Sequence, residues 1–112
     1  MAVEIKYPEI GRRLREVRHT LKLPMEALGN ETGMSRSYLS EFEKGTKRPT
    51  SKYLIHLHDK YRVSLNYIFG SDSRMFRKDD GDEINFGKFQ DEVDDMLLMM
   101  FKVPNVLFSV LG

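Results

Sequence analysis

Apolar residues recur at helical spacing in five short stretches of the first seventy residues. The first stretch predicts a helix over residues 8–20, because its apolar members follow one another at intervals of three or four, as residues on one face of a helix do. Those members are Ile10, Leu14, Val17 and Leu21. Pro8 favours this start, since the first helical position needs no amide donor.

Shorter stretches predict a second helix over residues 24–32 and a third that runs from its N-cap Ser35 to Lys44. Gly33 and Gly45 follow these two helices directly, and glycine readily adopts the left-handed conformation that ends a helix. Both helices are therefore expected to be short and sharply bounded.

A fourth helix is predicted over residues 51–61, and a short fifth helix is expected between its cap Ser64 and the terminating Gly70. Five short helices joined by tight turns indicate an all-α domain. We place this domain at residues 1–70.

The remainder of the chain has a different pattern. Residues 71–85 are polar and lack an apolar period, which predicts a linker. The helical period returns in residues 86–112 and predicts a C-terminal helical extension. We interpret its apolar stripe as a surface for homodimerisation, formed by Phe86, Phe89, Val93, Met96, Leu97, Met100 and Phe101. The alternatives are packing on the first domain and binding of a protein partner or ligand, since methionine suits adaptable surfaces.

Charge separates the same two halves. Residues 1–70 carry 13 Lys or Arg against 8 Asp or Glu, and residues 71–112 carry 5 against 9, although the whole chain has a net charge of only +1. This division indicates different partners for the two halves, with nucleic acid a candidate for the basic one.

The chain has no cysteine, which excludes disulfides and thiolate metal sites. We see no signal-peptide core and no apolar run near the roughly 20 residues that cross a bilayer. A cytoplasmic protein without a membrane partner is expected.

Residues 25–49 combine helix, glycine, helix, glycine and basic turn in that order. Gly29 supplies a small residue where two helices cross steeply, and Gly33 supplies a permissive turn. Leu39 and Phe42 are three residues apart, so they turn one face of the third helix inward. The opposite face is left for a ligand.

This pattern resembles the Cro and phage-repressor family of helix-turn-helix proteins, also called the XRE family, over residues 10–70. The resemblance lies in Leu-Pro-Met-Glu-Ala-Leu at 23–28, in Gly-Met-Ser-Arg-Ser-Tyr-Leu-Ser-Glu-Phe-Glu-Lys-Gly-Thr-Lys-Arg-Pro at 33–49, and in Val-Ser-Leu-Asn-Tyr-Ile-Phe-Gly at 63–70. It implies a five-helix, lambda-repressor-like domain that binds double-stranded DNA. The third helix would be the recognition helix, which enters the major groove.

The resemblance also implies individual roles. The side chains expected to read base edges are Arg36, Ser37, Ser40 and Glu41. Arg36 fits a guanine, because its guanidinium can bond O6 and N7 together, whereas Glu41 can accept from cytosine but repels phosphates. Contacts to the DNA backbone are expected from Ser35, Tyr38, Lys44, Thr46, Lys47 and Arg48. For Tyr38, packing against the second helix is the alternative.

The family pairs an arginine of the first helix with a glutamate late in the recognition helix, and Arg18 and Glu43 match these positions. We expect a structural ion pair. Two positions depart from the family. Met25 stands where a glutamine often touches a phosphate, and Gly29 stands where alanine is usual. On helix propensity, Gly29 is expected to loosen the second helix by roughly 1 kcal/mol.

Histidines and acids do not favour a metal site or an enzyme. His56 and His58 are two residues apart, which directs them to different sides of a helix. The acids of residues 79–83 lack the ligand spacing of a calcium loop, and no nucleophile with a base is evident. No catalytic residue, cofactor or metal is expected.

The predicted function is a sequence-specific transcriptional regulator, in particular a repressor that binds operator DNA as a homodimer. The alternative is a protein-interaction module, such as an antitoxin or an adaptor, that uses the same fold to bind a protein.

Overall fold

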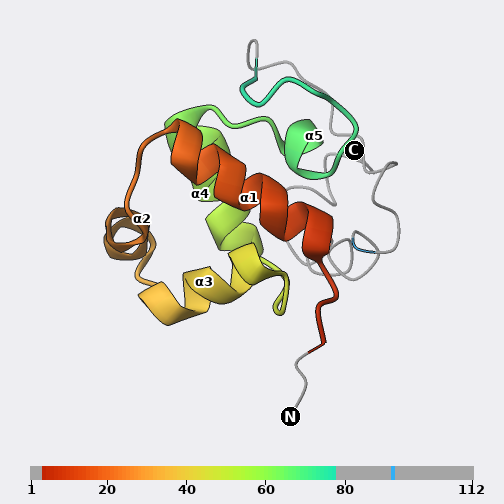
Figure 1. Cartoon of the computed structure of the whole chain (residues 1–112). Helices are drawn as coiled ribbons and strands as arrows, with labels where there is room; N and C mark the ends of the chain where they lie inside the picture. The colour runs from red at the N-terminus through yellow and green to blue at the C-terminus, as the bar shows by residue number, and fades with distance from the viewer. Residues whose placement is uncertain (1–3, 78–91, 93–112) are drawn as a thin grey trace, which may run out of the picture.

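The computed structural model describes residues 4–77 and Glu92 (Figure 1). Its helices are α1 (Pro8–Thr20), α2 (Met25–Thr32), α3 (Arg36–Lys44), α4 (Ser51–Tyr61) and α5 (Leu65–Ile68). These helices confirm the predicted all-α, five-helix domain. Within residues 4–77, no helix combines the length and the apolar character needed to cross a membrane.

The helix ends follow from local chemistry. At the start of α3, α4 and α5, a hydroxyl side chain accepts a hydrogen bond from the amide three residues on, and the three capping residues are Ser35, Thr50 and Ser64. Such a cap contributes about 1 kcal/mol. α2 and α3 end at Gly33 and Gly45, whose φ angles of 74° and 80° are left-handed.

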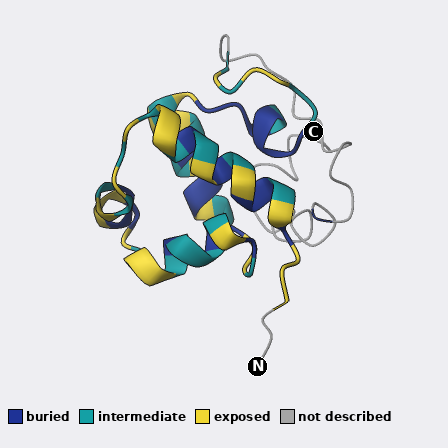
Figure 2. Ribbon diagram, viewed as in Figure 1, coloured by how far each residue is buried: buried dark blue, intermediate teal, exposed yellow. Residues whose placement is uncertain are grey.

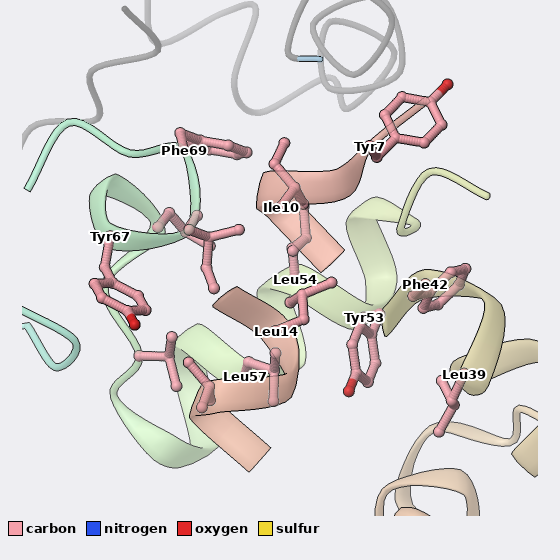
Figure 3. Close-up of a cluster of buried hydrophobic side chains, with 14 of the residues drawn as sticks. Tyr7, Ile10, Leu14, Leu39, Phe42, Tyr53, Leu54, Leu57, Tyr67 and Phe69 are labelled. Atoms are coloured by element: carbon pink, nitrogen blue, oxygen red, sulfur yellow. The ribbon is translucent and has the colours of Figure 1, made fainter. Parts of the chain in front are cut away.

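The helices enclose one apolar core. α1, α3 and α4 each have a buried face and an exposed face, whereas α5 is almost entirely buried (Figure 2). The largest fully buried side chains are Tyr53, Phe42, Phe69, Ile10, Leu14, Leu28, Leu39, Leu54, Leu57, Ile68 and Val17, most of which Figure 3 shows. The rings of Phe42 and Tyr53 lie 5.4 Å apart between their centroids, so they join α3 to α4.

Two glycines allow helices to approach closely. A Cβ at Gly11 would lie 2.7 Å from the carbonyl oxygens of Phe42 and Glu43, so the first turns of α1 rest directly on the end of α3. A Cβ at Gly29 would lie 2.7 Å from the carbonyl oxygen of Met34. The predicted need for a small residue at position 29 thus has a structural basis, because the following backbone approaches too closely for a Cβ. The expected loosening of α2 by Gly29 stays a prediction.

Part of the segment predicted as a linker lies along the connection between α4 and α5. Val63 and Phe76 form an isolated antiparallel bridge, and the Ser64 amide donates to the Met75 carbonyl at 2.8 Å. Met75 also packs against the core. Residues 78–91 and 93–112 lie outside the described residues, and with them the rest of the linker, the predicted C-terminal helix and the whole predicted dimer surface.

Candidate nucleic-acid interface

The face of α3 that points away from the core carries the side chains expected to read base edges. Leu39 and Phe42 are fully buried, which fixes the rotation of α3 about its axis. On the other side, Arg36 and Ser37 are exposed and Ser40 is half-buried. The buried face of α3 thus holds the helix in place while its polar side chains point outward.

A hollow with a volume of about 730 Å³, which we call the α3 hollow, borders this face. It is lined by Arg18, Pro24, Met25, Arg36, Ser37, Ser40, Glu41 and Lys44. All four candidates for base reading therefore share one surface with Lys44. Arg18 also lines the hollow, but its charge is paired with Glu43. Of the other charged side chains there, Arg36 and Lys44 outnumber the carboxylate of Glu41, which favours a polyanion.

Ser35 is not part of this hollow. Its hydroxyl accepts a hydrogen bond from the Tyr38 amide at 3.1 Å and caps α3. The Tyr38 ring packs edge-on against Phe42 of its own helix, with 4.7 Å between the centroids. Capping and ring packing thus order the leading end of α3.

A second hollow, with a volume of about 340 Å³, lies beside α3 and the turn that follows it, and we call it the turn hollow. It is lined by Lys6, Tyr7, Tyr38, Thr46, Lys47, Arg48 and Thr50. The structure thus brings Tyr38 and the basic turn together, whereas Lys44 lines the α3 hollow and Ser35 lines neither. Lys6, Lys47 and Arg48 make the turn hollow cationic.

Glu41 links the two hollows. Its carboxylate lies 3.3 Å from Lys47 Nζ, and the same ammonium lies 5.2 Å from the centroid of the Tyr38 ring. The Glu41 carbonyl accepts hydrogen bonds from the amides of Thr46 and Lys47 at 3.1 and 3.3 Å. Glu41 therefore orders the turn and offsets part of the charge of Lys47.

An ion pair in the wall of the α3 hollow joins α1 to α3. Arg18 Nε donates to Glu43 Oε2 at 2.7 Å and Arg18 Nη2 donates to Glu43 Oε1 at 3.1 Å, while Nη1 donates to the Leu23 carbonyl at 3.2 Å. The hydrogen bonds to Glu43 raise the pKa of Arg18. The two side chains are only 15% and 5% exposed, so the pair is largely buried and ties the recognition helix to α1.

Lys6, Tyr7 and Thr50 line the turn hollow although the sequence did not indicate them. Thr50 follows Pro49 and caps α4, so its place before a predicted helix was the available signal. Lys6 and Tyr7 reach the turn because both amides donate to the Gly45 carbonyl at 3.0 Å. No local sequence pattern predicts that contact.

A separate polar cluster lies between α2 and α4, formed by Glu31, His56, Lys60 and Tyr61. His56 Nε2 and Glu31 Oε1 are 2.7 Å apart, and Tyr61 donates to Glu31 Oε2 at 2.7 Å. Hydrogen bonds from His56 and then Tyr61 lower the pKa of Glu31 to about 2. Across the described residues, no group of three or more His, Asp or Glu side chains is placed to hold a metal ion.

Comparison with known proteins places these surfaces in context. A family model described as a helix-turn-helix domain matches residues 9–66. No solved structure gives a significant match.

Three relatives from Bacillus subtilis (strain 168) are similar to the chain. The uncharacterised HTH-type transcriptional regulator YobD is 38% identical over 58 residues, which are 52% of each chain. The HTH-type transcriptional regulator SlrR is 32% identical over 75 residues, 66% of this chain and 49% of SlrR. The HTH-type transcriptional regulator ImmR is 26% identical over 76 residues, 68% of this chain and 59% of ImmR. The chain thus matches only about half the length of these relatives.

Proposed function

This chain belongs to the helix-turn-helix domain family, and on that basis we propose that it is a DNA-binding transcriptional regulator without catalytic activity. One observation carries the proposal: Arg36, Ser37, Ser40 and Glu41 line one concave surface on the outer face of α3. The cationic turn hollow is lined by Tyr38 of the same helix and by the turn that follows it. The similar regulators of Bacillus subtilis agree with this assignment.

In this proposal, α3 enters the major groove with its N-terminal half leading. Arg36 is exposed, and within the described residues it forms no ion pair with a carboxylate. Its guanidinium is therefore available for a guanine edge. Lys47 and Arg48 bind phosphates and set the register of the helix without reading sequence. Met25 contributes an apolar side chain to the α3 hollow, where it cannot donate to a phosphate.

We further propose that the protein represses transcription from the cytoplasm as a homodimer, with residues 86–111 as the dimer surface. An apolar period over these residues supports this, since two-fold dimers match the spacing of paired half-sites. Occupation of an operator blocks polymerase without further machinery. Sedimentation of the full chain tests the dimer, which Met96→Glu together with Met100→Glu should dissociate. A wild-type monomer at tens of micromolar contradicts it.

Selection of bound duplexes from a random pool tests DNA binding and gives the half-site. On the selected duplex, Arg36→Ala should cost about 1–3 kcal/mol and relax the preference at one base pair. Lys47→Ala should weaken binding to every sequence and reduce the salt slope by about one. Lys60→Ala, which removes a cation of the Glu31 cluster, is the matched control and should leave both properties unchanged.

The proposal is wrong if no duplex is enriched and the chain does not bind random duplex at low salt. Equal effects of the Arg36, Lys47 and Lys60 substitutions would also contradict it, because only net charge would then matter. Enrichment of asymmetric single sites would support DNA binding while contradicting the dimer.

A further inference from the structure

The first turn of α1 is capped by a side chain from the far end of the chain. Tyr7 is the N-cap residue, and its side chain makes no capping hydrogen bond to the helix. Instead, Glu92 Oε1 accepts hydrogen bonds from the amides of Glu9 and Ile10 at 3.1 and 3.0 Å, and Oε2 accepts from Glu9 at 3.3 Å. Glu92 is only 8% exposed. A remote carboxyl thus satisfies amides that helix starts leave without partners.

The capped turn bears directly on the end of the recognition helix. Just before α1, the amides of Lys6 and Tyr7 both donate to the Gly45 carbonyl at 3.0 Å. A Cβ at Gly45 would lie 2.7 Å from the Tyr7 carbonyl oxygen, so the two backbones touch. Any movement of the first turn of α1 must therefore displace Gly45 or break these hydrogen bonds.

Gly45 leads straight into the basic turn. The next two amides, those of Thr46 and Lys47, are held by the Glu41 carbonyl, and Lys6 and Tyr7 line the turn hollow with them. Glu92, the first turn of α1 and the turn hollow form one continuous set of contacts.

We infer that Glu92 is a positioning residue for DNA binding: by capping α1 it holds Lys6, Tyr7 and Gly45 in place and so orients the phosphate-binding turn. This inference rests on the proposed function. It connects residue 92, which lies in the half of the chain with the predicted partner surface, to the opposite, DNA-binding half. A partner that displaces Glu92 from α1 would weaken the contacts between the basic turn and the DNA backbone.

Acceptor geometry and charge predict opposite effects of substitutions here. If only charge mattered, loss of any acid would strengthen binding to a polyanion. Glu92→Gln loses the charge but keeps one side-chain oxygen, which can still accept hydrogen bonds from the amides of Glu9 and Ile10. Burial raises the pKa of the Glu92 carboxyl, although the Ile10 and Glu9 amides act in the opposite sense, which is consistent with tolerance of a neutral side chain.

The test uses the full chain with Glu92→Ala, Glu92→Gln and Glu92→Asp, and with Asp59→Ala as a control that removes an exposed acid from α4. Amide hydrogen exchange is followed at Lys6, Tyr7, Thr46 and Lys47, with the capped amides of Glu9 and Ile10 as the local reference. Affinity for a random duplex is measured at several salt concentrations. The Asp variant keeps the charge but shortens the reach. It also replaces the Ala variant if that one does not fold.

The Ala and Asp variants should lose protection at these four amides and bind the duplex roughly 3- to 10-fold more weakly, with a shallower salt slope. The Gln variant should keep protection and bind at least as tightly as the wild type. The Asp59 control should bind equally or slightly more tightly.

The inference is overturned if the Ala and Asp variants lose protection only at Glu9 and Ile10 while duplex affinity is unchanged, since Glu92 would then be a local cap. It is equally overturned if Ala and Gln both strengthen binding like the control. Failure of the wild type to bind random duplex would instead contradict the proposed function, and the exchange data would still decide whether Glu92 holds the turn.

Discussion

The backbone of Gly29 lies so close to the carbonyl oxygen of Met34 that a Cβ on residue 29 would stand 2.7 Å from that oxygen. The Gly29 carbonyl in turn accepts hydrogen bonds from the amides of Gly33 and Met34 at 2.8 and 3.1 Å. Residue 29 therefore determines how tightly the turn between α2 and α3 closes, and with it where the recognition helix starts.

Gly29→Ala should destabilise the domain by about 1–3 kcal/mol, because the added methyl group meets backbone atoms that cannot move independently. Helix propensity alone predicts the opposite, a gain of roughly 1 kcal/mol. Urea denaturation of the two chains measures the difference. Asn30→Ala, an exposed neighbour in the same helix, is the control and should be neutral or slightly stabilising. A more stable Gly29→Ala chain would show that the turn accommodates the methyl group.

Arg18→Ala should cost about 3–5 kcal/mol, because it leaves the buried carboxylate of Glu43 without its partner. Arg15→Ala, at an exposed position of the same helix, should change the free energy of unfolding by less than about 0.5 kcal/mol. Denaturant titration again provides the measurement. Similar small losses in both variants would mean that water replaces Arg18 around Glu43.

Glu31 should make the stability of the domain sensitive to acid. Its pKa is about 2 in the folded chain against 4.5 for the free side chain, so the carboxylate favours the folded state. This contribution is fully present above pH 4.5 and is lost as the pH falls toward 2. Glu31→Gln should therefore cost up to about 1 kcal/mol at neutral pH, given the partial exposure of the cluster.

The comparison requires unfolding free energies of both chains across that pH range. The difference between wild type and Glu31→Gln should shrink as the pH falls from 4.5 toward 2. A difference that stays constant with pH would assign the cost to lost hydrogen-bond geometry. Asp59→Asn, which changes an exposed acid on α4, serves as the control.

Glu41→Gln should raise affinity for random duplex by roughly 3- to 10-fold at low salt, because it frees Lys47 from its ion pair and removes a charge that faces the phosphates. At the selected half-site the same variant should lose preference at one base pair, if Glu41 accepts from cytosine there. Competition binding between selected and random duplexes measures both effects. Unchanged affinity for both duplexes would exclude Glu41 from the interface.

Residues close together in the chain specified the helices and the outer face of α3. Ser35 and Ser64 cap helices, Gly33 and Gly45 end them, and the spacing of Leu39 and Phe42 rotated the polar positions of α3 outward. Each of these signals acts within one or two helical turns, so a single sequence suffices to detect it.

Contacts between distant segments came only from the folded arrangement. The hydrogen bond from the Ile10 amide to the Glu92 carboxylate joins residues that no local sequence signal relates. The same is true of the hydrogen bond from the Lys6 amide to the Gly45 carbonyl. An apolar stripe predicts that a helix packs against something, but it does not identify the partner or the crossing angle. Many arrangements of the helices would bury the same stripe. The amides, carbonyls and carboxylates that finally meet therefore depend on how all five helices pack together, and that packing is what joins Glu92 to the proposed DNA-binding face.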